Sequence, residues 1–92
     1  MTVLVVDRDW TALRKEAEAI TRMNTAVTVV LKSSAEAAAQ FAMYHPVDFV
    51  FVRAGMCEDM LFPKIRRYQP MAECRILGAG EDLKPFLVPY TL

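Results

Sequence analysis

The chain has 92 residues, of which 54% are hydrophobic and 24% are charged, a composition typical of a packed globular domain. This length fits one hydrophobic core, so we expect residues 1–92 to form a single domain. Eleven Lys and Arg residues balance eleven Asp and Glu residues, and the formal net charge is zero. This balance argues against direct nucleic-acid binding and against a polybasic membrane anchor.

The sequence also lacks signals for membrane insertion and secretion. No apolar run approaches the roughly 20 residues needed to span a bilayer. The first ten residues contain two Asp residues and lack a basic start followed by an apolar stretch, which argues against a signal peptide. Cys57 and Cys74 do not make a disulfide framework. We therefore expect a soluble cytoplasmic protein without a membrane contact.

The first part of the chain alternates between strand-like and helix-like patterns. Residues 2–6 are a β-branched apolar run, which predicts a strand buried on both faces. Residues 10–23 carry Leu13, Ala17 and Ile20 at helical spacing. Residues 26–31 form a second strand-like run. The order strand, helix, strand is thus predicted for this part of the chain.

The middle of the chain repeats this alternation. Ser33 and Glu36 match a capping box, which predicts that an alanine-rich helix begins there. The helix should run to Tyr44, because a proline that follows closely disfavours further helix. Residues 48–52 are apolar after their first position and predict a third buried strand.

The last part of the chain is less regular. A proline is best tolerated in the first turn of a helix, so Pro63 predicts a third helix that starts between residues 60 and 63. That helix should end by Gln69. Residues 74–77 predict a fourth strand. Residues 81–92 contain two prolines, so we expect an irregular tail or an edge strand there.

Strands that alternate with helices across short loops predict a three-layer α/β fold, in which crossover helices cover a parallel sheet. In such sheets the ligand site lies beyond the carboxyl ends of the strands. Chain order therefore predicts that one crevice gathers the residues at the ends of three strands, namely Asp7, Arg8, Asp9, Arg53 and Gly78.

In order and spacing, these segments resemble bacterial response-regulator receiver domains. The resemblance covers residues 2–80 and implies a flavodoxin-like sheet of strand order 2-1-3-4-5, here shortened after the fourth strand. It depends on the strand and charged cluster of residues 3–9, the helix start at residues 34–38, the strand and loop of residues 46–56, the helix and exit at residues 65–70, and the strand of residues 75–79.

The resemblance implies phosphoryl transfer from a phosphohistidine to an aspartate at the end of the third strand, assisted by a divalent metal on the acidic cluster. A Thr or Ser after the fourth strand and a Lys after the fifth would contact the phosphoryl group. In this chain the acceptor position is Arg53, the middle acidic position is Arg8, and the Thr or Ser position is Gly78. A guanidinium accepts no phosphoryl group and repels Mg²⁺. We therefore expect a degenerate phosphorylation site with no catalysis, no metal and no cofactor.

The counterpart of the family's lysine is ambiguous. Lys84-Pro85-Phe86 resembles the Lys-Pro-Phe that follows the fifth strand in the family. Residues 78–83 would then match the segment just before that Lys-Pro-Phe, yet Gly78-Ala79 also matches the end of the fourth strand. Both matches hold only if a helix is deleted. Lys84 is therefore a candidate member of the degenerate site, with its position in the sheet left open.

Two interpretations of the crevice remain open. In the favoured one, Arg53 occupies the space of the metal and pairs with Asp7, because an arginine–carboxylate pair satisfies both groups without a ligand. In the other, Arg8 and Arg53 clamp an anion, and the chain is a small anion-binding or enzymatic α/β domain.

The apolar tail is the second predicted functional feature. Its side chains could join a second copy or another protein by strand addition or through an apolar patch, or fold back as a fifth edge strand. We expect a phosphorylation-independent pseudo-receiver of two-component signalling or transcriptional regulation, which binds a protein partner or itself as a homodimer. The predicted interaction surface consists of Phe86, Leu87, Val88 and Tyr90.

Overall fold

The computed structural model describes residues 1–23, 26–56, 58–78 and 80–81. The described strands form one parallel sheet in the order β2-β1-β3-β4. The predicted alternation of strands and helices is confirmed. The elements are β1 (Thr2–Val6), α1 (Trp10–Met23), β2 (Thr28–Lys32), α2 (Ala35–Tyr44), β3 (Phe49–Arg53), α3 (Glu58–Tyr68) and β4 (Glu73–Leu77).

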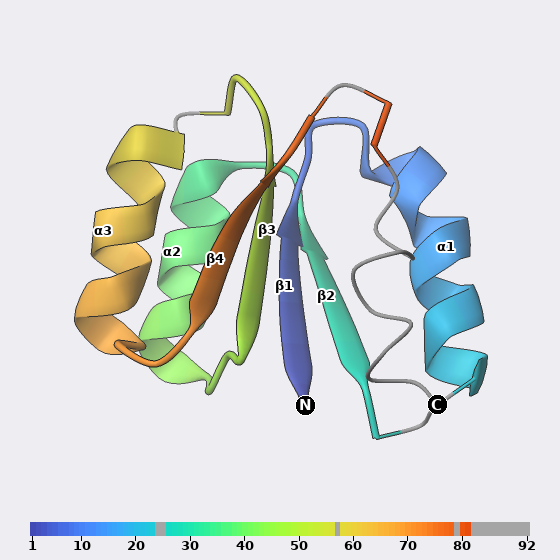
Figure 1. Cartoon of the computed structure of the whole chain (residues 1–92), viewed down its shortest axis with the longest axis horizontal. Helices are drawn as coiled ribbons and strands as arrows, with labels where there is room; N and C mark the ends of the chain where they lie inside the picture. Colours follow the sequence, from blue (N-terminus) through green and yellow to red (C-terminus); the bar gives the residue numbers. More distant parts are fainter. Residues whose placement is uncertain (24–25, 57, 79, 82–92) are drawn as a thin grey trace.

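The sheet lies between two helical layers, with α1 on one face and α2 and α3 on the other (Figure 1). Successive side chains of a strand point to opposite faces. Leu4 and Val6 of β1 accordingly belong to the core beneath α2 and α3, and Val3 and Val5 belong to the core on the α1 side. Because both faces are covered, β1 is apolar at every buried position.

Side-chain burial, and not proline, decides where α3 begins. The prediction of a start between residues 60 and 63 is wrong, since α3 begins at Glu58 and Pro63 lies inside it. Leu61 and Ile65 are buried on one side of the helix, while Pro63 is exposed. Burial of two such side chains contributes about 1.5–3 kcal/mol each. This offsets the roughly 3 kcal/mol that an interior proline costs a helix.

The start of α2 also differs from the prediction by one residue. The helix is capped by Ser34 and not by Ser33, because the backbone N–H of Ala37 donates to Ser34 Oγ at 3.1 Å. Two adjacent serines offer the same capping chemistry, so the sequence alone does not distinguish them. The helix ends at Tyr44, as predicted, with His45 at its carboxyl cap.

Gln69 ties the carboxyl ends of α2 and α3 together. Its side-chain Nε2 donates to the carbonyl oxygens of Ala42 and His45, both at 2.9 Å. Its Oε1 accepts from the backbone N–H of Val47 at 3.4 Å. One side chain after α3 thereby satisfies backbone groups at the end of α2 and in the segment that leads to β3.

Within the described residues the sheet ends at β4, in line with the shortened pattern expected from the sequence. No helix in this part of the chain is long and apolar enough to cross a membrane. Five sequence-predicted site residues lie outside the described residues, and their roles stay predictions. They are Lys84 and the proposed interaction surface of Phe86, Leu87, Val88 and Tyr90.

Candidate functional site

The predicted crevice corresponds to the place where β1 and β3 end side by side. The two strands pair in parallel, with Val6 opposite Val52. The next residues, Asp7 and Arg53, are therefore level with each other. Arg53 Nε donates to Asp7 Oδ2 at 2.9 Å, and the two side chains are only 18% and 13% exposed. The ion pair favoured from the sequence is present in the structure.

Arg53 also holds the segment that follows β4. Its Nη1 donates to the carbonyl oxygen of Gly78 at 2.6 Å and to that of Glu81 at 2.9 Å. The backbone continues this link, since Ala54 N donates to Leu77 O at 2.8 Å. One guanidinium thus joins the carboxyl ends of β1, β3 and β4, and its Nε and Nη1 are both engaged.

Asp7 is fixed from the other side. Its Oδ1 accepts from the backbone N–H of Asp9 at 3.0 Å, a local turn typical of aspartate. Its own backbone N–H donates to the carbonyl oxygen of Lys32, at the end of β2, at 3.0 Å. Both carboxylate oxygens of Asp7 therefore have partners, and the network reaches all four strand ends of the described sheet.

The remaining predicted residues contribute unequally. Arg8 is exposed and makes no hydrogen bond or ion pair with another described residue. Asp9 enters through its backbone N–H. Gly78 enters through its carbonyl, and a Cβ added there would lie 3.3 Å from Glu81 Oε1. The carbonyl of Glu81 is a member of the network that the sequence did not predict.

The loop that follows Arg53 depends on glycine. Gly55 has a φ of 91°, a left-handed conformation that disfavours any side chain with a Cβ. Its N–H lies 3.5 Å from Glu58 Oε1 in the first turn of α3. Met56 N donates to Arg53 O at 3.2 Å, which closes the turn directly behind the guanidinium.

The crevice does not fit the divalent metal that the family resemblance implies. The guanidinium of Arg53 takes the open side of the Asp7 carboxylate, at 2.9 Å. A second cation there would be repelled by a charge that is permanent at any physiological pH. Within the described ranges, no group of three or more His, Cys, Asp or Glu residues could hold a metal ion.

The described thiol is poorly suited to nucleophilic chemistry. Cys74 of β4 is partly buried against the core beneath α3. Burial raises the pKa of this thiol above its ordinary value of 9.0, and the nearby Arg66 opposes part of that rise. A thiol of this kind is largely protonated at neutral pH and therefore unreactive. Cys57 lies outside the described residues.

No protein-family model and no curated protein matches this chain. Solved structures do resemble it. They include a response regulator protein from Burkholderia pseudomallei with a phosphorylated aspartic acid, a calcium ion and citrate (TM-score 0.70, 18% identity), a CheY-like receiver domain protein from Methanospirillum hungatei JF-1 (0.69, 15%) and a response regulator from Thermotoga maritima (0.63, 25%).

These likenesses span most of this chain, at 85%, 96% and 95% respectively. The chain in turn spans 46% of the Burkholderia chain and 73% and 72% of the other two. Together with the sheet order and the layers, they define a flavodoxin-like α/β fold. Within that class the fold is receiver-like, as the order of the sequence segments predicted.

Proposed function

We propose that this chain is a pseudo-receiver, a signalling module that binds a protein partner through a fixed surface and does not cycle through an aspartyl phosphate. The supporting observation is the bond from Arg53 Nε to Asp7 Oδ2 at 2.9 Å. A receiver needs a carboxylate at the end of β3 to accept a phosphoryl group, and this chain has a guanidinium there. The proposal covers residues 1–92 as one domain.

The nearest other carboxylate along β3 is not a substitute. Asp48 precedes the strand, and its Oδ2 accepts from the backbone N–H of Thr2 at 2.8 Å. The five residues from Asp48 to Arg53 separate it from the crevice by about 16 Å. Asp48 therefore stabilises the opposite end of the sheet and takes no part in the crevice.

The hydrogen bonds of Arg53 hold the strand ends in one conformation, where a receiver would change conformation on phosphorylation. A ligand shifts a conformational equilibrium only if it binds one state better than the other. In this chain the cation that joins the strand ends is the side chain of Arg53, so no ligand is needed to hold the segment after β4. The same surface is then presented at all times, and signalling depends on the amount of the protein or of its partner.

The rival interpretation, an anion clamp made by Arg8 and Arg53, has less support. Such a clamp requires free donors that converge on one point. Two nitrogens of Arg53 already donate to protein oxygens, and Arg8 is exposed outside that network. Titration with inorganic phosphate tests it, and we expect neither a chemical shift change at the crevice nor a rise in melting temperature.

The proposal is tested by treating the chain with Mg²⁺ and acetyl phosphate, with a phosphorylatable receiver domain in the same tube as a positive control. We expect the control to gain one phosphoryl group by intact mass and this chain to gain none. Beryllofluoride should likewise leave the amide spectrum of this chain unchanged. An aspartyl phosphate on this chain would overturn the proposal.

The degenerate origin of the crevice is tested by the double variant Arg8→Asp with Arg53→Asp. It places four carboxylates at the strand ends and removes both cations, which should create affinity for Mg²⁺. We expect Mg²⁺ to raise the melting temperature of this variant and not that of Arg53→Ala. Failure of Mg²⁺ to stabilise the folded double variant would contradict the assignment of a former metal site.

A further inference from the structure

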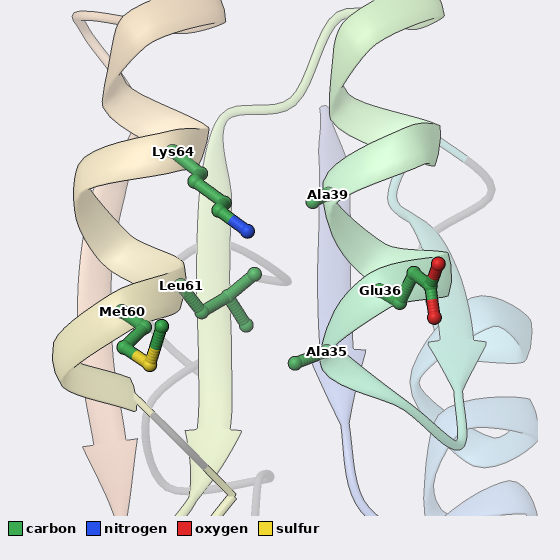
Figure 2. A pocket seen from close by; sticks show the side chains of 6 residues that line it. All are labelled: Ala35, Glu36, Ala39, Met60, Leu61 and Lys64. Atoms are coloured by element: carbon green, nitrogen blue, oxygen red, sulfur yellow. The ribbon is translucent and has the colours of Figure 1, made fainter.

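A groove runs between the exposed sides of α2 and α3, on the side of these helices that faces away from the sheet (Figure 2). It consists of two adjoining hollows of about 350 and 440 Å³, which share Glu36, Ala39 and Lys64. The full lining is Ala35, Glu36, Ala39, Gln40, Met43, Met60, Leu61, Lys64, Arg67 and Tyr68.

The groove has an apolar base, and its walls carry both apolar and charged side chains. The alanines of α2 are short, so the space above them and above Leu61 is not filled by the chain's own side chains. Larger apolar groups stand beside that space and are open to solvent: Met60 is 67% exposed, Met43 44% and Tyr68 43%. Single exposed apolar residues are ordinary, but several along two adjoining hollows indicate a binding surface.

The charges of the groove, Glu36, Lys64 and Arg67, form no ion pair with another described residue. Lys64 and Arg67 are three residues apart on α3 and so share one helix face. The three ion pairs among the described residues are Arg14–Glu18, Arg53–Asp7 and Arg75–Glu73, and none of them includes a groove residue. Figure 2 shows Lys64 reaching from α3 toward α2. The α3 wall therefore carries two exposed positive charges beside an apolar base, and Glu36 of α2 is the acidic residue of the lining.

We propose that this groove binds an amphipathic α-helix of another protein, with an apolar ridge against the base and Asp or Glu side chains along the flank that faces α3. The inference rests on the proposed function as an interaction module, because it names the surface and the chemistry of the partner. It does not depend on the tail residues 82–92.

The dimensions of the groove favour a helix over an extended peptide. Met60 and Tyr68 are eight residues apart on α3, which corresponds to about 12 Å along the helix axis. A partner helix with apolar residues at i, i+4 and i+8 spans the same length, and its ridge packs between two neighbouring helices in the usual manner. Acidic residues one turn apart on its flank would then meet Lys64 and Arg67.

A second copy of this chain is a poorer match than an acidic helix. Helix α1, with the sequence WTALRKEAEAITRM, has three basic and two acidic residues, and α3 is itself the positive wall. Neither helix offers a continuous acidic flank to Lys64 and Arg67. Charge complementarity therefore selects a partner of different composition.

The test is a display library of short helical peptides with a fixed apolar ridge and one flank varied among Glu, Gln and Lys. It is selected in parallel on the full chain and on the variant Lys64→Glu with Arg67→Glu. We expect the wild type to enrich Glu on that flank and the variant to enrich Lys. A synthetic peptide from the wild-type selection should lose about tenfold or more in affinity for the variant, since two surface pairs become repulsive.

The matched control is Lys15→Glu with Arg22→Glu on α1, which changes the net charge by the same amount at exposed positions. The selected peptide should bind this control within about twofold of the wild type. Equal losses in both variants would mean bulk charge only and would overturn the proposal, as would the absence of any enrichment. Lys64→Gln with Arg67→Gln, expected to show a smaller loss, replaces the reversal if that variant does not fold.

Other occupants would appear as distinct results. A dimer by light scattering that the Lys64→Glu/Arg67→Glu variant dissolves would assign the groove to a second copy. Competition by a synthetic peptide of residues 82–92 would assign it to that segment. Either result overturns the proposal. If no acidic helix binds the groove and the chain is not phosphorylated, the groove proposal fails and the pseudo-receiver proposal stands. An aspartyl phosphate would refute the pseudo-receiver proposal whatever the groove binds.

Discussion

The strand-end crevice and the α2–α3 groove are opposite in how they use charge. In the crevice, Arg53 and Asp7 are mostly buried and both carboxylate oxygens of Asp7 have a partner. In the groove, Lys64, Arg67 and Glu36 are exposed and belong to none of the ion pairs among the described residues. Among the residues that the structure describes, the Arg53 and Asp7 charges of the crevice are paired, and the charges of the groove are not.

This difference suits the crevice to holding the fold and the groove to binding another molecule. A satisfied, partly buried ion pair holds the fold and leaves little for a ligand to gain. An apolar hollow beside unpaired charges gains contacts only when another molecule arrives. Under the proposed function, the strand-end residues are structural, and the surface suited to a partner lies on α2 and α3.

The largest expected effect contrasts two arginines. Arg53→Ala leaves the mostly buried Asp7 carboxylate without its cation and frees two carbonyls, so it should lower the free energy of unfolding by about 2–4 kcal/mol. Arg67→Ala removes an exposed charge near the end of α3 and should cost less than about 1 kcal/mol. Urea denaturation of both variants measures this difference. Equal costs would erase the distinction between the two regions.

The same contrast holds for two carboxylates. Asp7→Asn keeps the shape of the side chain but removes the charge opposite Arg53, and we expect a loss of about 2 kcal/mol. Glu36→Gln in the first turn of α2 removes only a favourable helix-terminus charge and should cost about 0.5 kcal/mol. Thermal melts at neutral pH compare the two. A larger loss for Glu36→Gln would mean that the groove carries structural charge.

Two glycines show whether the crevice depends on backbone or on space. Gly55→Ala forces a side chain into a φ of 91° and should cost about 1 kcal/mol. Gly78→Ala brings a Cβ to 3.3 Å from the end of the flexible Glu81 side chain and should change stability by less than about 0.5 kcal/mol. Urea midpoints report both. A severe loss for Gly78→Ala would show that more than its carbonyl matters.

The smallest expected effect concerns the Cys74 thiol beneath α3. Burial raises its pKa, so in a Cys57→Ser background its alkylation rate should reach half-maximum above pH 9.0. Below pH 9.0 the thiol is mostly protonated in both the folded and the unfolded chain, so its ionisation does not lower the stability there. Above it the unfolded chain ionises first and stability falls. The Lys64→Glu/Arg67→Glu variant should be alkylated at the wild-type rate, and faster reaction would reveal that α3 had loosened.

The elements were predictable where periodicity and termination signals agree. Helix α1 has the predicted bounds, and α2 ends where His45-Pro46 indicated. Pro63 misled because its local cost is visible in the sequence, whereas the burial of Leu61 and Ile65 that offsets it depends on tertiary packing. The order of the strands in the sheet was predicted from the family resemblance, since a short apolar run does not indicate which strand lies next to it.

The candidate site was predictable in its centre and not at its margins. Asp7 and Arg53 each sit at the end of an interior strand, so adjacent strands bring them together. Arg8 has a long, exposed side chain whose direction no pattern determines. The carbonyls of Gly78 and Glu81 accept from Arg53, but a backbone acceptor is present in every residue and carries no sequence signal.

Gln69 couples the local unfolding of α2 to that of α3. The hydrogen bonds of its side-chain amide with Ala42, His45 and Val47 break when either helix leaves the sheet, because they connect the end of α3 to the end of α2 and the segment that follows it. Opening of either helix therefore exposes backbone groups of both, and the pair behaves as one cooperative unit toward hydrogen exchange. The two walls of the groove are then set at a constant separation before any partner arrives, which lowers the conformational entropy lost on binding.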